Sequence, residues 1–134
     1  MSPYLNDSRT GPAILFVEDD EEVCDPIAAR LQQAGYSVLV ARNEEDAVHN
    51  LAGDQFPIGL ILVNQKMPSD EALVIGRRIR ERARLDPSVP MIVLPYEYEA
   101  AVEGTDQPVG DNDYKTYMVD IDQLTTLIKR LFPV

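Results

Sequence analysis

Cysteine and long apolar runs are both scarce in this sequence of 134 residues. Cys24 is the only cysteine, which excludes an internal disulfide and a metal cluster built on cysteines. We expect Cys24 to be a small buried thiol on a helical face, with a reactive thiol as the alternative. The longest apolar runs, 14–17 and 91–94, have the length of strands, whereas a membrane-spanning helix needs roughly 20 residues. The start of the chain is polar and lacks the apolar centre of a signal peptide, so a cytoplasmic protein without membrane insertion is expected.

Positive charge is also in short supply, because 12 Lys and Arg residues face 23 Asp and Glu residues, for a net charge of -11. Such a balance disfavours binding to nucleic acid or to anionic membranes. One predicted helix runs against this trend. It carries five arginines, which form either a solvated helix face or a docking patch for an acidic partner: Arg77, Arg78, Arg80, Arg82 and Arg84.

The apolar content of 45% is sufficient for one domain with a core, and the length is too small for two. Residues 1–11 show no periodicity and are expected to form a flexible leader before a single domain over residues 12–134. Apolar periodicity and Gly, Pro and Asn punctuation predict the elements of this domain. Strands are expected at 13–17, 36–40, 58–63, 91–94 and 114–119, and helices at 21–34, 43–53, 70–85, 97–103 and 122–132.

This alternation of strands and helices predicts an α/β fold with three layers, a doubly wound five-stranded parallel sheet between two layers of helices. For the flavodoxin-like strand order 2-1-3-4-5, the functional site lies at the carboxyl ends of the first and third strands, where the strand order reverses. Four polar side chains follow these two strands directly: Glu18, Asp19, Asp20 and Asn64.

Carboxylates that directly follow a buried strand commonly bind a divalent cation, because clustered oxygen ligands match what Mg²⁺ requires. The alternative is that Asp20, Glu21 and Glu22 cap the first helix and favour its positive end. We expect both roles to contribute.

Several motifs occur in an order and at a spacing that resemble one family. They are the run Ile-Leu-Phe-Val-Glu18-Asp19-Asp20, Gly35-Tyr36, Met67-Pro68 and Asp113-Tyr114. Together they resemble the CheY-like receiver domain of two-component response regulators, over residues 13–131. The resemblance implies a signalling module rather than an enzyme, with a histidine kinase or an output protein as its partner.

The departures from this family concentrate in the phosphorylation chemistry. The resemblance places an acceptor aspartate at Asn64, a Ser or Thr at Pro95 and a lysine at Tyr117. An amide lacks the nucleophilic oxygen, proline lacks a hydroxyl and a phenol lacks the ammonium charge. The family proline that follows the lysine is Met118 here, which predicts a trans peptide bond at that point. We therefore interpret the chain as a degenerate pseudo-receiver that acts as a phosphorylation-independent interaction module.

Two alternative functions remain open from the sequence. The first is a phosphorelay receiver that uses another carboxylate, namely Asp19, Asp20 or Asp70. The second is a small-ligand sensor whose cavity is reshaped by Pro95, Tyr96 and Tyr117.

Metal binding is expected to be weak and not required, because Asn64 leaves Glu18 and Asp19 with one neutral carbonyl. If no cation binds, Lys66 or Tyr117 would instead interact directly with one of these carboxylates. The single histidine, His49, is expected to be exposed without a role.

Partner binding is expected at one of two surfaces. Tyr96 and Tyr98 lie near the face of the fourth helix, fifth strand and fifth helix, which related receivers use for partners and which could also support a homodimer. The other surface is the arginine helix, with Arg77 and Arg78 as its candidates. We favour the tyrosine surface, because aromatic side chains supply contact area at little cost in entropy.

Overall fold

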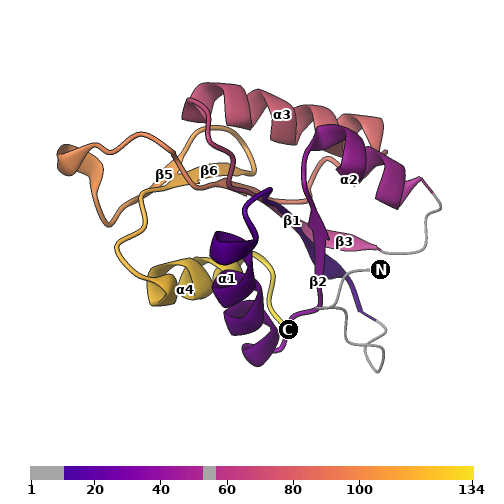
Figure 1. Ribbon diagram of the computed structural model, residues 1–134, viewed down its shortest axis with the longest axis horizontal. Coiled ribbons are helices and arrows are strands. Elements are labelled where there is room, and N and C mark those ends of the chain that lie inside the picture. The colour runs from indigo at the N-terminus through magenta and orange to yellow at the C-terminus, as the bar shows by residue number, and fades with distance from the viewer. Residues whose placement is uncertain (1–10, 53–56) are drawn as a thin grey trace.

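The computed structural model describes residues 11–52 and 57–134 (Figure 1). The predicted leader, apart from its last residue, and the predicted helix end at Gly53 lie outside these residues. The elements in chain order are β1 (Ala13–Val17), α1 (Glu21–Gln33), β2 (Val38–Ala41), α2 (Glu44–Leu51), β3 (Ile58–Val63), α3 (Ser69–Arg82), β4 (Met91–Val93), η1 (Ala100–Val102), β5 (Asp106–Pro108), β6 (Asp113–Thr116) and α4 (Ile121–Leu131).

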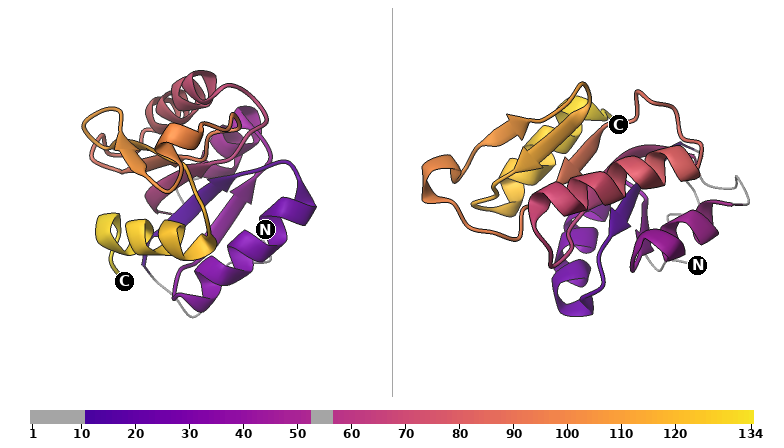
Figure 2. Two further views of the ribbon diagram at one scale, coloured as in Figure 1. Left: turned by 90° about the vertical axis from the view of Figure 1, so that its left-hand side faces the viewer. Right: turned by 90° about the horizontal axis from the view of Figure 1, so that it is seen from above.

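One mixed sheet lies at the centre of the domain, in the order β2-β1-β3-β4-β6-β5. Five of its strands are parallel to their neighbours, and only β5 pairs antiparallel, with β6. Helices α2 and α3 cover one face, while α1 and α4 cover the other (Figures 1 and 2). The predicted three-layer α/β fold and its parallel strand order are therefore confirmed, with β6 as the fifth parallel strand.

The segment after β4 differs from the prediction, because the helix expected over residues 97–103 does not form. Only the short 3-10 turn η1 is present, and the chain then returns along β6 as β5. Gly104 allows this reversal, with a φ of 80° and an N–H that donates to the Tyr117 carbonyl at 2.7 Å. A helix confined between Pro95 and Gly104 would also be short enough to be marginal without packing.

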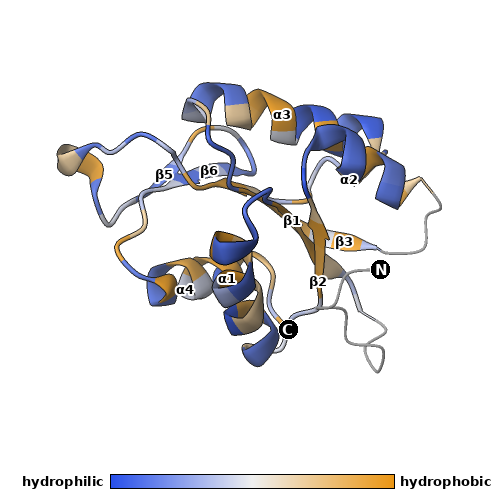
Figure 3. Ribbon diagram, viewed as in Figure 1, coloured by the Kyte–Doolittle hydropathy of each residue, from blue (hydrophilic) through white to orange (hydrophobic). Residues whose placement is uncertain are grey.

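The core has two parts, one on each face of the sheet. Figure 3 shows hydrophobic central strands β1 and β2, hydrophilic outer strands β5 and β6, and helices that carry both hydrophilic and hydrophobic residues. Cys24 lies in the part under α1 and is only 4% exposed. Its burial raises the pKa of this thiol to about 11, so it stays protonated near neutral pH, as expected for a structural cysteine rather than a reactive one.

Helix α3 is tied to α2 by ion pairs that centre on Glu44, whose side chain is 11% exposed. Arg78 Nη2 lies 2.5 Å from Glu44 Oε1, and Arg82 Nη1 lies 2.7 Å from Glu44 Oε2. The hydrogen bond from Arg78 is the largest cause that lowers the pKa of Glu44 to about 2, against an opposing effect of burial. These ion pairs link α2 to α3 on the face of the sheet that both helices cover.

Acid should weaken the α2–α3 contact. Because the folded-state pKa of Glu44 lies below its unfolded value of 4.5, its contribution to stability is present above pH 4.5 and is lost as the pH falls towards 2. From pH 6 to pH 3 the unfolding free energy of the unmodified protein should fall by about 1–2 kcal/mol more than that of Glu44→Gln, after allowance for solvent screening. Urea unfolding at both pH values measures this difference. Glu81→Gln, on the exposed face of α3, is the matched control, and an identical pH response of all three proteins would contradict the assignment.

Candidate functional site

Glu18 and Asn64 meet at the carboxyl ends of β1 and β3. The two strands are paired in register, with Val17 opposite Val63, so the residues that follow them are neighbours. Asn64 Nδ2 donates a hydrogen bond to Glu18 Oε1 at 2.5 Å. The predicted convergence of Glu18 and Asn64 is confirmed, and their contact joins an amide to a carboxylate.

Glu18 is a buried carboxylate, with only 4% of its surface exposed. Burial raises its pKa, and hydrogen bonds from the backbone N–H of Asp20 at 3.2 Å and from Asn64 oppose that effect without cancelling it. Both carboxylate oxygens therefore have a donor within the protein. The hydrogen bond from the Asn64 amide therefore stabilises the charged form of this buried acid.

The other two acidic residues of this segment have separate environments. Asp20 is the N-cap of α1, where its Oδ1 accepts from the Glu22 N–H at 3.0 Å, and its Oδ2 lies 3.5 Å from Lys66 Nζ. The predicted capping role is confirmed, and Lys66 does satisfy a carboxylate, that of Asp20. Asp19 is exposed to solvent.

The side chains at this edge do not fit an Mg²⁺ site. Mg²⁺ requires several oxygen ligands in near-octahedral geometry, whereas Glu18 faces an amide nitrogen and Asp20 is occupied by a helix N-terminus and Lys66. Over residues 11–52 and 57–134, no group of three or more His, Cys, Asp or Glu residues is arranged to hold a metal ion. His49 is exposed, in agreement with the prediction of an exposed side chain.

Pro95 and Tyr117 lie together in a second part of the site, a cavity of about 210 Å³ between the loops that follow β4 and β6. Burial is the main cause that raises the pKa of Tyr117, and the charge of Glu99 adds to it. No cis peptide bond occurs in the part of the chain that the structure describes, so the bond before Met118 is trans as predicted. We call this cavity the tyrosine pocket; its lining is Pro95, Tyr96, Glu97, Tyr98, Glu99, Glu103, Tyr117 and Met118.

A polar network that the sequence did not reveal links α3 to the strand ends. Lys115 Nζ lies 2.5 Å from Asp70 Oδ1 in the first turn of α3, and Glu97 Oε1 accepts from the Ser69 N–H at 2.8 Å. Pro68 provides no side-chain cap for α3, so Glu97 satisfies the helix terminus from the β4 loop. Burial raises the pKa of Glu97, but its hydrogen bonds from Ser69 outweigh this and the pKa is lowered. The alternation of β6 could have indicated that Lys115 shares the α3 side with Asp113, since neighbouring residues of a strand face opposite sides.

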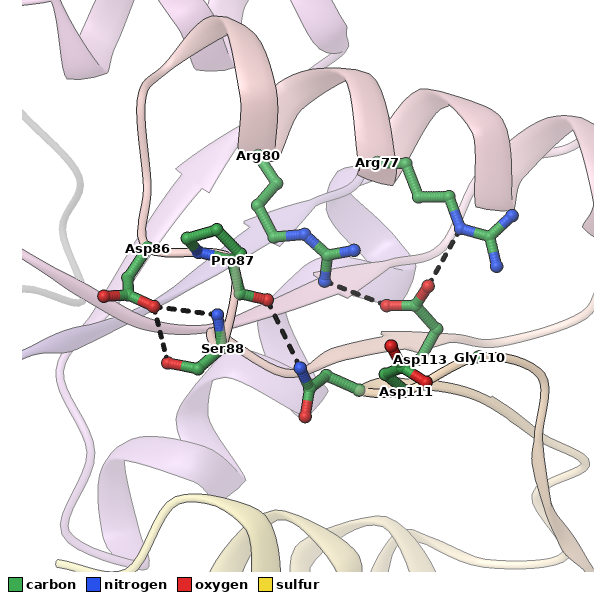
Figure 4. A pocket seen from close by; sticks show the side chains of 9 residues that line it. Arg77, Arg80, Asp86, Pro87, Ser88, Gly110, Asp111 and Asp113 are labelled. Atoms are coloured by element: carbon green, nitrogen blue, oxygen red, sulfur yellow. Dashed lines mark hydrogen bonds and ion pairs between the residues drawn. The ribbon is translucent and has the colours of Figure 1, made fainter.

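The arginines of α3 are bound within the chain. Arg77 Nε and Arg80 Nη1 lie 2.8 Å and 2.9 Å from the two oxygens of Asp113, whose side chain is 5% exposed (Figure 4). Arg78 is paired with Glu44. An open cavity of about 720 Å³ lies beside Arg77 and Arg80, at the amino ends of β4 and β6. It is therefore at the opposite edge of the sheet from Glu18 and Asn64, which we call the acidic edge. The two candidate arginines, Arg77 and Arg78, therefore serve contacts inside the domain.

Comparison with known proteins gives a consistent picture. The family model of the response regulator receiver domain matches residues 14–129. The phosphate regulon transcriptional regulatory protein PhoB of Pseudomonas aeruginosa is 31% identical over 119 residues, which is 89% of this chain and 51% of that protein. The uncharacterized transcriptional regulatory protein YkoG of Bacillus subtilis is 28% identical over 116 residues, 87% of this chain and 49% of its own length. The chain thus spans about half the length of these curated relatives.

Solved structures show the same fold. The receiver domain of the hybrid histidine kinase CckA matches with a TM-score of 0.61 at 23% identity, over 89% of this chain and 97% of that domain. The response regulator TrrA of Thermotoga maritima, in complex with Mg²⁺ and a beryllium fluoride, matches with a TM-score of 0.63 at 20% identity, over 91% of this chain and all of that one. None of the helices in the described residues has the length and apolar character to cross a bilayer. With a matching family model over most of its length, this chain belongs to the response regulator receiver domain family of two-component signalling proteins.

Proposed function

We propose that this receiver domain signals without accepting a phosphoryl group and works as a protein interaction module rather than as an enzyme. The observation that carries the proposal is the Asn64–Glu18 hydrogen bond of 2.5 Å. It occupies the place where the family resemblance implies an acceptor carboxylate and a cation. At this edge the two side chains bind each other.

Phosphoryl transfer to a protein needs a nucleophile, charge stabilisation and donors around the phosphoryl oxygens. The Asn64 amide is not a nucleophile, because its nitrogen lone pair is delocalised into the carbonyl. Pro95 offers neither a hydroxyl nor an N–H, and Tyr117 offers a neutral phenol whose pKa is raised. Each of the three requirements therefore lacks its residue.

The other carboxylates considered as acceptors are engaged or poorly placed. Asp70 is paired with Lys115 and its side chain is 88% exposed, and Asp20 caps α1. Asp19 is exposed to solvent, where nothing holds a phosphoryl group in a fixed position. None of these environments combines a metal site with donors for a phosphoryl group, so the interaction role is favoured over an alternative acceptor.

The partner that fits this role is another signalling protein, such as a histidine kinase or an output protein. Mg²⁺ is not required, because Glu18 already has two donors. A homodimer through η1, β5, β6 and α4 is a second form of the same proposal, since these elements replace the predicted face of fourth helix, fifth strand and fifth helix. Nucleic acid is disfavoured as a partner by the net charge of -11.

Phosphorylation assays test the proposal directly. We expect incubation with acetyl phosphate and Mg²⁺, or with a histidine kinase of the same pathway, to leave the intact mass unchanged. A receiver domain that retains its acceptor aspartate is the positive control under the same conditions. A gain of one phosphoryl group would overturn the proposal, and its position at Asp19, Asp20 or Asp70 would establish the alternative acceptor instead.

A further inference from the structure

The tyrosine pocket is an exposed concavity with an unusual combination of side chains. Tyr96 and Tyr98 are 65% and 73% exposed, among the most exposed large apolar side chains of the described residues. The hydroxyl of Tyr98 donates to Glu103 Oε2 at 3.0 Å, which orients this ring relative to the pocket. Exposed aromatic rings at a concave site usually mark a contact surface.

The charge of the pocket is negative throughout. Its lining contains three carboxylates, from Glu97, Glu99 and Glu103, and no lysine or arginine. The backbone carbonyl of Glu99 accepts from the Val102 N–H at 3.2 Å, whereas its carboxylate has no hydrogen bond or ion pair within the described part of the chain. The nearest cation of the network, Lys115, is bound to Asp70. The pocket therefore offers aromatic faces and carboxylates to a cation that the domain does not itself supply.

We propose that the tyrosine pocket receives an arginine side chain of a partner protein, an inference that rests on the proposed interaction function and specifies its chemistry. A guanidinium is planar, stacks on aromatic faces and binds carboxylates through a fork of N–H donors. An ammonium lacks both the plane and the fork. The combination of Tyr96 and Tyr98 with Glu99 matches the guanidinium better.

The size of the pocket favours a side chain over a free ligand. Its volume of about 210 Å³ is below the roughly 300–1,000 Å³ of pockets that bury a small molecule or cofactor. One arginine side chain with its stem along Pro95 and Met118 is a better match. This argues against the small-ligand sensor that Pro95, Tyr96 and Tyr117 suggested.

A second copy of this chain is a poor source for the arginine. Two copies of net charge -11 repel each other at long range, which disfavours the exposed Arg42, Arg84 and Arg130 of another copy. Five other arginines each form an ion pair within the domain: Arg30, Arg77, Arg78, Arg80 and Arg82. Placing one of these five in the pocket of another copy would break its ion pair. We therefore commit to a different protein with a basic segment, which the net charge of -11 would also attract at long range.

Peptide titration tests this proposal on the intact chain. The probe is the blocked peptide Ac-Ala-Arg-Ala-NH₂, and the readout is the NMR signals of the tyrosine rings. We expect saturable shifts at Tyr96, Tyr98 and Tyr117 with a dissociation constant on the order of millimolar. The matched peptide with citrulline, which keeps the shape of arginine but has no charge, should give no saturable shift, and the lysine peptide should bind several-fold more weakly.

Variants separate the pocket from the rest of the acidic surface. Glu99→Gln with Glu103→Gln should weaken the arginine peptide about fivefold, and Tyr96→Leu about threefold. Glu21→Gln, an exposed carboxylate in the first turn of α1, should change nothing. The proposal would be overturned if the arginine peptide gave no saturable shifts, or if the citrulline or lysine peptide bound as tightly as the arginine peptide. It would also be overturned if Glu21→Gln weakened the arginine peptide as much as the pocket variants do.

The outcome is independent of the phosphorylation test. A domain that is not phosphorylated and does not bind the arginine peptide would retain the proposed function and lose only the assigned partner chemistry. A domain that is phosphorylated would lose the proposed function, whatever the peptide result.

Discussion

Asn64→Asp is expected to make the stability of this domain depend on Mg²⁺, which the unmodified protein should not show. In the unmodified domain Asn64 Nδ2 donates to Glu18 Oε1 at 2.5 Å. The substitution replaces that donor with a second carboxylate beside a buried one, and like charges at this distance repel strongly. We expect the unfolding free energy to fall by about 2–3 kcal/mol without metal ions, through the lost hydrogen bond and the repulsion.

Mg²⁺ should restore much of this loss, because a cation bound only by the folded state stabilises it increasingly as its concentration rises above Kd. Urea unfolding with EDTA and with increasing Mg²⁺ measures the effect. Asn64→Ala is the matched control, since it removes the same hydrogen bond without adding charge and should lose stability at every Mg²⁺ concentration. If Asn64→Asp shows no response to Mg²⁺, the acidic residues at this edge do not converge on a common cation.

The same variant also separates metal binding from phosphoryl transfer. Aspartate at position 64 supplies a nucleophile, but Pro95 and Tyr117 still lack the hydroxyl and the ammonium group. Lys115 does not replace the missing ammonium group, because it is paired with Asp70. We therefore expect a gain in metal dependence without efficient acceptor chemistry.

The acidic edge could be predicted from the sequence because its signals are local. The continuous apolar runs of β1 and β3 define buried strands, and the residue after each run lies at the same edge of a parallel sheet. That reasoning alone is sufficient to bring Glu18 and Asn64 together. Local signals also give the cap at Asn43, where Oδ1 accepts from the Asp46 N–H at 2.8 Å.

The contacts that the sequence did not predict are those between distant segments. Arg78 and Arg82 are paired with Glu44 of another helix, and a helical wheel shows only that they face outward. Strand β5 is polar and three residues long, and forms because Gly104 turns the chain back onto β6. Local propensity cannot name the partner of a charge or the strand that a loop will join, because tertiary contacts decide both.

Asp113→Ala should be among the most destabilising single changes in the domain, with an expected loss of about 3–5 kcal/mol of unfolding free energy. Burial raises the pKa of Asp113, but its hydrogen bonds from Arg80 and Arg77 outweigh this and the pKa is lowered. The carboxylate is thus charged and almost fully buried, with 5% of its side chain exposed. Its removal leaves Arg80, whose side chain is 16% exposed, without a counter-charge between α3 and β6.

Asp111→Ala is the matched control, because Asp111 is exposed on the same loop and should change stability by no more than about 0.5 kcal/mol. Equal losses in the two variants, measured by urea unfolding, would show that the Arg77–Asp113–Arg80 cluster does not hold α3 to β6. A further variant separates the cost of breaking the pair from its net value. Since replacing a buried ion pair by apolar residues is often neutral, Asp113→Leu combined with Arg80→Met should recover most of the lost stability, although Arg77 would still lack its partner.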